Sequence, residues 1–414
     1  MSKLERVTVF VLFLLATGAG QAFFANPALT DDRGQPLTQA AFGLIYIALV
    51  LSLVRYRSAV VSLLKKEKWT ALLCLWCLAS VAWSVDPAES LRHLLALIGT
   101  SIAALFLALH YEPKEQLRLA ALALGFGAIA SLAVALVLPS VGFTSDGSMQ
   151  GIYYLKNSLG RMMSLGAFCF ALQVFTERRN RVLRTAMFLV CCVLLVLSRS
   201  ATAIVVTALM LMFLPLCKVL CLSTRKLIAA TAVLLPFTAA AVLCAVESSD
   251  QILQALGRDA SLTGRIPLWH LVMKEIAERP ILGFGFSAFW HSWEGQRLSD
   301  TVAWDVAVPH AHNGFLEIWL GLGIVGLAMV LISIGRNLIQ ALRTVRSQRD
   351  MEHAWPLLLI VFTILYNLTE NSLLSANSAP WIAYGAATFW LVRAEQEVSF
   401  DLEPEAENEP VYSS

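Results

Sequence analysis

Apolar runs long enough to cross a lipid bilayer recur along almost the whole chain, and they restrict its fold more than any other feature. Hydrophobic residues make up 57% of the 414 residues and charged residues only 14%, whereas a soluble domain carries roughly a quarter charged residues. A spanning helix needs about 20 mostly apolar residues. We therefore expect an all-α integral membrane protein with about twelve spans, at residues 7–24, 38–54, 69–84, 92–110, 119–138, 159–175, 185–199, 200–220, 227–246, 314–334, 353–370 and 378–393.

The distribution of Lys and Arg predicts which way the spans run. With the N-terminus placed inside, 21 of the 31 Lys and Arg residues fall in inner segments and 10 in outer ones, as the positive-inside rule requires. We therefore expect both termini in the cytoplasm and an uncleaved first span. The same orientation brings Lys156, Arg199, Arg265 and His312 to the outer side.

Polar segments divide the chain into four parts. Residues 1–246 hold nine predicted spans, residues 247–313 form a long outer loop with two or three short helices, and residues 314–394 hold three more spans. Residues 395–414 are acidic and are expected to form a disordered cytoplasmic tail. The Gly-rich segment GFGFSAF matches no dinucleotide or phosphate-loop motif, so we expect no cofactor and no cytoplasmic nucleotide-sugar donor.

Arg265 lies near the start of a predicted helix in this outer loop. Thr263 suits the N-cap, Pro267 the first turn and Pro280 the end of that helix. A helix N-terminus beside a guanidinium suits a phosphate or pyrophosphate; alternatively, Arg265 is an ordinary exposed residue. Apolar residues at helical spacing predict an amphipathic helix that lies on the membrane surface: Leu268, Leu271, Val272 and Ile276.

Three further cations lie beside predicted spans. Arg199 stands between two apolar runs, where a charge is costly unless it is paired or solvated. Lys156 precedes a span, with Arg161 about one turn further on. These side chains could simply reach lipid headgroups. Together with Arg265, they could instead converge on a pyrophosphate without a metal.

Titratable side chains also surround the start of the tenth predicted span. His312 can accept a proton from a hydroxyl near pH 7, although its ring could instead cap the following helix. His310 and His312 form an HxH pair without a nearby third ligand, so we predict no metal. Glu317, inside the helix, needs a cation or His312 as its partner. We include His310, Asn313, Glu317 and Glu370 among the substrate-binding candidates.

The motifs in this region resemble a known family. SLTGRIPLW, ERPILGFGFSAFW and HAHNGFLEIWLGLGIVGL are similar to the signature region of the O-antigen ligase and polysaccharide polymerase superfamily. GIYYLKNSLG and LSRSATA resemble its two upstream motifs, in the same order. The resemblance extends by motif from Tyr153 to about Asn371, and by topology over the whole chain.

The resemblance implies a metal-independent, inverting glycosyltransferase of the GT-C type. Such enzymes move a glycan from undecaprenyl pyrophosphate onto a sugar hydroxyl in the periplasm. Arg199 and Arg265 match the family arginines that hold the pyrophosphate. His312 matches the histidine that orients or deprotonates the acceptor, and Lys156 matches the lysine of a KN motif that would add to the phosphate site.

The family contains polymerases, which use a second lipid-linked glycan as acceptor, and ligases, which use lipid A–core. The motifs resemble exopolysaccharide-type polymerases more closely, so we favour a polymerase over an O-antigen ligase. A lipid or polysaccharide transporter is a third reading, but transporters tend to show repeated halves and no repeat is visible. The expected partners are the lipid-linked donor, the acceptor glycan, membrane lipid and a candidate chain-length regulator, but no nucleic acid. The expected location is the bacterial inner membrane, with the active site facing the periplasm.

Overall fold

The computed structural model describes residues 3–24, 36–222, 265–302 and 308–401. The described residues are helical and form no strand; Phe143 and Met149 make one isolated bridge. The predicted span at 227–246, the expected cap Thr263 and residues 402–414 lie outside the described residues. The all-α prediction is confirmed for the part of the chain that the structure describes.

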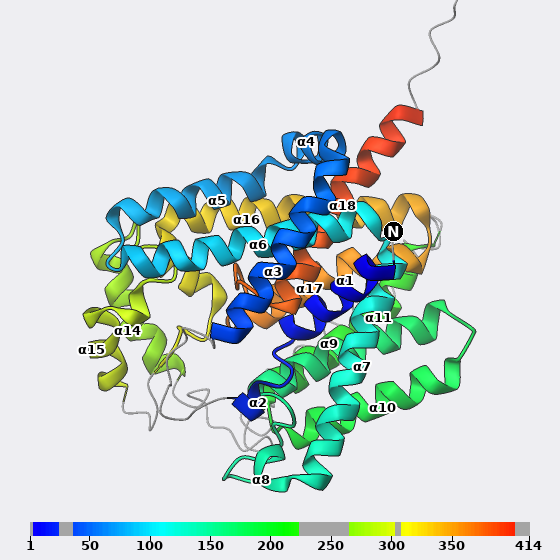
Figure 1. Cartoon of the computed structure of the whole chain (residues 1–414), viewed down its shortest axis with the longest axis horizontal. Coiled ribbons are helices and arrows are strands. Elements are labelled where there is room, and N and C mark those ends of the chain that lie inside the picture. Colours follow the sequence, from blue (N-terminus) through cyan, green and yellow to red (C-terminus); the bar gives the residue numbers. More distant parts are fainter. Residues whose placement is uncertain (1–2, 25–35, 223–264, 303–307, 402–414) are drawn as a thin grey trace, which may run out of the picture.

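Figure 1 shows the helices that the structure describes. The α-helices are α1 Lys3–Ala16, α2 Gln21–Phe24, α3 Pro36–Leu53, α4 Arg57–Lys66, α5 Lys68–Ser80, α6 Pro87–His110, α7 Pro113–Val137, α8 Pro139–Gly142, α9 Lys156–Thr176, α10 Arg181–Leu197, α11 Ala201–Leu220, α14 Arg265–Glu278, α15 Trp293–Thr301, α16 Gly314–Gln348, α17 Ala354–Asn367 and α18 Ala379–Asp401. Short 3₁₀ helices are η1 Val54–Tyr56, η2 Val81–Trp83, η3 Phe289–His291 and η4 Met351–His353.

Six of the described helical segments are long and apolar enough to cross a membrane: Leu37–Lys66, Pro87–His110, Pro113–Val137, Lys156–Thr176, Ala201–Leu220 and Gly314–Gln348. This agrees with a membrane protein, although it does not reach the predicted number of twelve spans. One predicted span is divided in the structure. The run at 7–24 breaks after α1, because Gly18 and Gly20 adopt positive φ angles of 80° and 86°, a conformation that ends a helix.

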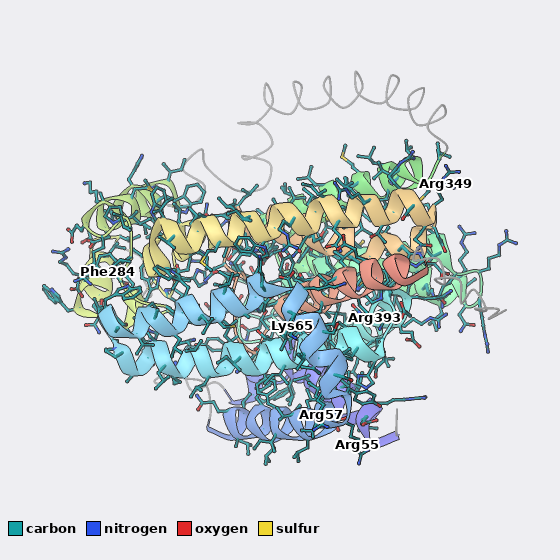
Figure 2. All side chains as sticks on the ribbon, turned by 90° about the horizontal axis from the view of Figure 1, so that it is seen from above. Arg55, Arg57, Lys65, Phe284, Arg349 and Arg393 are labelled. Carbon is teal, nitrogen blue, oxygen red and sulfur yellow. The ribbon has the colours of Figure 1, made fainter. Side chains whose placement is uncertain are left out.

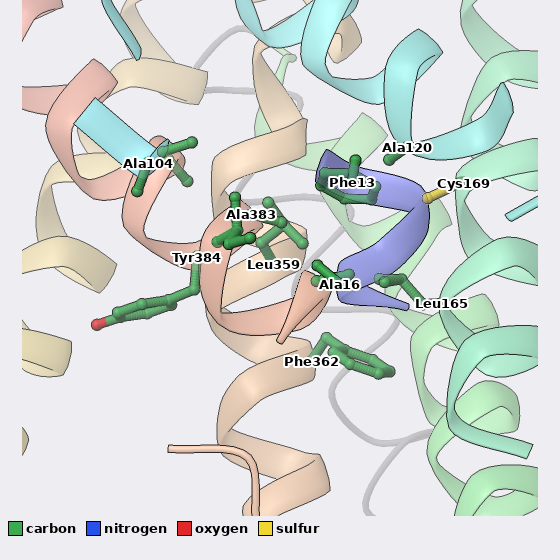
Figure 3. Close-up of a cluster of buried hydrophobic side chains, with 14 of the residues drawn as sticks. Phe13, Ala16, Ala104, Ala120, Leu165, Cys169, Leu359, Phe362, Ala383 and Tyr384 are labelled. Carbon is green, nitrogen blue, oxygen red and sulfur yellow. The ribbon is translucent and has the colours of Figure 1, made fainter. Parts of the chain in front are cut away.

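The core of the bundle forms around α1 (Figure 3). Phe13 and Ala16 of α1 are buried and belong to one apolar cluster with residues of α7, α9, α17 and α18. The outward faces of the helices are also apolar; Leu44, Leu95 and other large side chains are well exposed. Apolar surfaces both inside and outside the bundle suit a protein surrounded by lipid rather than water.

Helix α16 is broken near its start, and the outer loop fills the break. Gly323 has φ 68° and ψ −175°, which is not helical. The Ile324 N–H, which would bond to the Leu320 carbonyl in a regular helix, instead donates to the Pro280 carbonyl at 2.9 Å. The Leu320 carbonyl accepts from the Phe284 N–H, also at 2.9 Å. The polar groups released by the break are thus satisfied inside the protein, as a bilayer requires.

The outer loop is held against the bundle by tryptophan side chains as well. The indole N–H groups of three tryptophans donate to backbone carbonyls of α16 and of the loop segment that pairs with its break: Trp76 to Leu322, Trp83 to Leu282 and Trp319 to Pro280. These bonds join η2 and α5 to the loop and to α16. The loop segment at 280–282 is therefore held against the long helices.

The predicted loop helix exists, but its apolar face does not lie on the membrane surface. Helix α14 begins at Arg265 with Pro267 in its first turn and ends before Pro280. Leu268 and Val272 are 0% exposed and pack against other residues of the loop and of α16. The expectation of a helix lying on lipid is wrong because the rest of the loop covers the apolar stripe.

Several arginines lie far from the outer-loop end of the bundle (Figure 2). Phe284 of the outer loop lies at one end, whereas Arg349 and Arg393 lie at the opposite end. Arg55 and Arg57 also lie away from Phe284 in this view. The predicted orientation requires this separation, because it has the outer loop on one side of the membrane and most Lys and Arg residues on the other.

Candidate active site

Three side chains from distant parts of the chain meet at the outer-loop end of the bundle. The Nη2 atom of Arg265 donates to Oε1 of Glu370 at 2.6 Å. The other carboxylate oxygen, Oε2, lies 3.4 Å from Nδ1 of His312. Only 8% of the Glu370 side chain is exposed, against 15% for each of its two partners. Glu370 is therefore the carboxylate that contacts His312, a point that the sequence left open.

Two neighbouring helices complete the surroundings of this ion pair. The Nη1 atom of Arg265 donates to Oγ1 of Thr202, in the first turn of α11, at 3.0 Å. Asn157, in the first turn of α9, reaches Glu370 Oε1 with its Nδ2 atom at 3.5 Å. The guanidinium is thus held from two sides, which fixes the direction in which its remaining N–H groups point.

The turn that carries Glu370 is organised by a buried asparagine. Asn367, the last residue of α17, is 0% exposed. Its Oδ1 atom accepts from the N–H groups of Ser372 and Leu373 at 2.7 and 3.0 Å. Asn313 ties this turn to α16, because its Nδ2 atom donates to the Leu368 carbonyl at 3.0 Å.

The turn that carries His312 is also held by side chains. His312 has a positive φ of 48°, and its N–H donates to Nδ1 of His310 at 3.2 Å. Asn313 is the N-cap of α16 and accepts from two N–H groups of its first turn. The structure therefore gives Asn313 and His310 positioning contacts around His312.

Glu317 has two neighbours that the sequence did not indicate. Its Oε2 atom accepts from the Ala311 N–H at 2.8 Å, and its carboxylate accepts from Nε1 of Trp290. The sequence suggested a cation or His312 as the partner, and that suggestion stays a prediction. The two bonds satisfy the half-buried carboxylate and hold the turn just before His312.

Electrostatics fix the charge of Glu370 and of His310 near neutral pH. Burial alone would raise the pKa of Glu370, but the contact with His312 and the charge of Arg265 outweigh it and lower the pKa to about 2. Burial, reinforced by the nearby His312, lowers the pKa of His310 to about 3. Glu370 is thus ionised and His310 neutral at pH 7.

The predicted cations fall into two groups. Lys156 forms an ion pair with Asp146 at 2.5 Å, and Nη1 of Arg199 donates to the Asp146 carbonyl at 3.1 Å. Arg161 instead belongs with Arg265, since its charge influences His310. The Nε atom of Arg161 is buried and has no hydrogen-bond partner among the described residues.

His310, His312 and Glu370 also form a triad of potential metal ligands. One ligand atom from each lies within 4.8 Å of the others, so the expectation that no third ligand lies near the HxH pair is wrong. However, Glu370 Oε1 already binds Arg265. The positive charge of Arg161 also lowers the pKa of His310. Added positive charge would meet repulsion here, which favours an anion over a divalent cation.

Sequence reasoning did not identify Asp146 or Thr202. Asp146 stands in a Ser-Asp-Gly stretch that is typical of an ordinary turn, and Thr202 stands in an apolar run. Asn157 was noticed only as a neighbour of Lys156. The one sequence feature that could have identified these three residues is that each lies within about ten positions of a motif cation.

Comparisons with known proteins agree with these motifs. Residues 185–331 match the family described as O-Antigen ligase. The exopolysaccharide production protein ExoQ of Rhizobium meliloti (strain 1021) is 27% identical over 336 residues, which cover 77% of this chain and 74% of that protein. A candidate polysaccharide ligase of Rickettsia conorii is 32% identical over 98 residues, 23% of this chain and 24% of that protein. A second, from Rickettsia prowazekii, is 35% identical over 86 residues, 20% and 21% respectively. Through the matched segment and the motifs around it, the chain is similar to the O-antigen ligase family and to proteins of polysaccharide production.

Proposed function

We propose that this membrane protein is a glycosyltransferase that moves a glycan from undecaprenyl pyrophosphate onto a sugar hydroxyl at the periplasmic face of the inner membrane. The observation that carries the proposal is the contact of Glu370 with both Arg265 and His312. It places a cation for a leaving phosphate beside an imidazole that can accept a proton.

The transfer reaction requires two further contributions from the protein. A glycosyl pyrophosphate already carries a good leaving group, so the enzyme has to stabilise the departing negative charge and aim the acceptor. Arg265 and Arg161 supply positive charge at a largely buried position. The Nε2 atom of His312 would take the proton of the attacking hydroxyl, while Glu370 at Nδ1 would stabilise the imidazolium that forms.

The donor bond that breaks joins the anomeric carbon to the pyrophosphate, and the new bond joins that carbon to the acceptor oxygen. Attack from the face opposite the leaving group inverts the anomeric configuration. The proton of the acceptor hydroxyl passes to His312, and the lipid pyrophosphate leaves with its electron pair. Positive side chains perform the neutralisation here, so we propose that the transfer needs no metal.

Two acceptors remain to be separated. The similarity to ExoQ extends over most of the chain, which favours an exopolysaccharide polymerase that uses a second lipid-linked glycan. The shorter similarity to polysaccharide ligases supports an O-antigen ligase with lipid A–core as acceptor. We place the polymerase first because its relative covers about three quarters of both chains.

Complementation of a cell that lacks the native protein tests the proposal. Wild type should restore long polysaccharide, whereas Arg265→Ala and His312→Ala, present at normal levels, should not. We expect Glu370→Gln to retain little activity, because an amide cannot stabilise the imidazolium that forms when His312 acts as general base; such general-base catalysis typically contributes about 10²- to 10⁴-fold in rate. Activity of the purified enzyme should survive EDTA.

The product identifies the acceptor. Free polymer made without lipid A–core supports the polymerase, whereas chains linked to lipid A–core support the ligase. Full complementation by both alanine variants would overturn the proposed site and make transport the better explanation.

A further inference from the structure

A short turn between α8 and α9 brings one aspartate to two of the motif cations. The N–H of Thr144 donates to the Ser148 carbonyl at 2.9 Å, and Gly147 has φ 73°. Asp146 lies at the tip, where its Oδ1 atom accepts from the Ser148 N–H at 3.0 Å. The turn is anchored to the end of α10, since the Met149 N–H donates to the Leu197 carbonyl at 2.9 Å.

Lys156 and Arg199, which we call the outer group, are both bound to Asp146. Lys156 Nζ pairs with Oδ2 at 2.5 Å, and Arg199 Nη1 donates to the backbone carbonyl of the same residue at 3.1 Å. The hydrogen bonds from Lys156 and Thr144 lower the pKa of Asp146 well below its usual range, so the carboxylate is charged at neutral pH.

This outer ion pair differs from the inner one in exposure. The side chains of Asp146 and Lys156 are 51% and 33% exposed, whereas those of Glu370 and Arg265 are 8% and 15% exposed. An exposed pair contributes little stability, and another anion can replace its carboxylate at little cost. The inner pair is too buried to exchange in this way.

The two groups of cations are linked by α9 and by the turn before α11. On α9, Lys156 precedes Arg161 by five residues, which corresponds to about 7.5 Å along a helix axis. Arg199 precedes Thr202, the residue that holds Arg265, by three residues. The turn containing Arg199 is pressed against α9, since a Cβ atom on Gly160 would lie 2.7 Å from Ser200. Long cationic side chains can bridge this distance to a single pyrophosphate.

We propose that Asp146 occupies the position of a donor phosphate in the unliganded protein and is displaced when the pyrophosphate binds. Displacement of the carboxylate frees Lys156, whereas Arg199 keeps its bond to the neighbouring backbone carbonyl. Asp146 is thus a residue that tunes donor affinity through Lys156. The inference rests on the proposed function and adds a competitor for its anion site.

The test compares Asp146→Asn with Asp300→Asn in the purified full-length protein. Asparagine keeps the oxygen that the turn needs and removes the charge. Asp300, on α15, is exposed and loses the same charge elsewhere in the outer loop. For Asp146→Asn, we expect the Kd for inorganic pyrophosphate and the KM for the lipid-linked donor to fall about two- to five-fold. We expect kcat to change less than two-fold and Asp300→Asn to behave as wild type.

A double variant separates competition from simple loss of charge. In a Lys156→Ala background, Asp146→Asn should give no further gain, because the cation that it competes for is absent. Weaker or unchanged pyrophosphate binding by Asp146→Asn would overturn the inference, and so would an equal gain in the Lys156→Ala background.

The outcomes also distinguish this inference from the proposed function. If transfer requires Arg265 and His312 but Asp146→Asn leaves Kd and KM unchanged, the inference fails and the function stands. If Asp146→Asn tightens pyrophosphate binding but neither the wild type nor any variant transfers glycan, the anion site stands and the proposed function fails.

Discussion

The ring of His310 shows how protonation of one residue can affect the whole site. Its Nδ1 atom accepts the N–H of His312, the residue with the positive φ angle. A protonated ring would carry a hydrogen at that nitrogen and could not accept this bond. Burial and the neighbouring charges lower the pKa of His310 to about 3, which keeps the acceptor intact at neutral pH.

This pKa predicts a stability that falls in acid. Between about pH 6.5 and pH 3, the unfolded chain protonates His310 and the folded chain does not. The unfolded state therefore binds more protons, and the free energy of unfolding falls as pH falls, by up to about 1.4 kcal/mol per pH unit. His310→Asn should flatten the dependence of the thermal unfolding midpoint on pH between 7 and 5. The exposed His270→Asn variant is the control, and parallel slopes for wild type and His310→Asn would contradict the prediction.

The sequence identified residues better than it identified their partners. Arg265, His312 and Glu370 were all candidates, because charged side chains beside apolar spans are costly without a purpose. The pairing of Arg265 with Glu370 joins residues 105 positions apart, and local patterns carry no information about such a contact. Glu317 shows the same limit, since an acidic residue in a first helical turn looks alike whether it meets a cation or a backbone N–H.

At the scale of elements, the break in α16 is the feature on which the outer loop depends. Gly323 adopts a positive φ, and a Cβ atom there would lie 1.9 Å from the Ile281 carbonyl oxygen. Gly335 lies further along the same helix, and a Cβ atom there would meet nothing within 4 Å. The two glycines form a matched pair within one helix.

Alanine at these positions should have opposite effects. Gly323→Ala should destabilise the protein by about 2 kcal/mol or more, through backbone strain and a clash with the loop. Gly335→Ala should stabilise it by about 0.5–1 kcal/mol, because alanine favours a helix. Thermal unfolding of the purified variants measures both effects. Equal stability of the two variants would mean that the loop does not depend on the break.

Hydropathy predicted most of the helices but not where the backbone departs from a helix. The predicted spans at 38–54 and 159–175 agree closely with α3 and α9. The break at Gly323 lies inside a continuous apolar run, as does the division between α1 and α2. Burial from water depends on side chains, whereas these breaks depend on single glycines and on the distant loops that pair with them.

At the scale of the whole molecule, the orientation can be measured directly. Single cysteines at positions 156, 199, 265 and 312, in a background lacking the native cysteines, should react with a membrane-impermeant maleimide from the periplasmic side. Position 199 should react fastest, because Arg199 is exposed and Arg265 and His312 are not. Arg349→Cys, at the opposite end (Figure 2), should react only after the membrane is permeabilised. Labelling of the site positions from both sides would contradict the predicted topology and the site together.

The class of the molecule followed from composition, because a chain with so few charges cannot remain folded as a soluble domain of this size. The family followed from several motifs in order. The arrangement of these motifs in space did not follow, since helices that are apolar on every side leave few clues about which faces pack together. The division of the motif cations between Asp146 and Glu370 is a result of that packing.

The contact between Arg265 and Glu370 also has a consequence for how the protein is made. Arg265 enters the membrane-associated chain long before Glu370 is synthesised, since 105 positions separate them. Until α17 has been inserted, the guanidinium lacks its buried counter-charge and His312 lacks its carboxylate. A nascent chain still emerging from the ribosome thus holds the motifs but no assembled site, so the contact between the three side chains forms only after the late helices have joined the bundle.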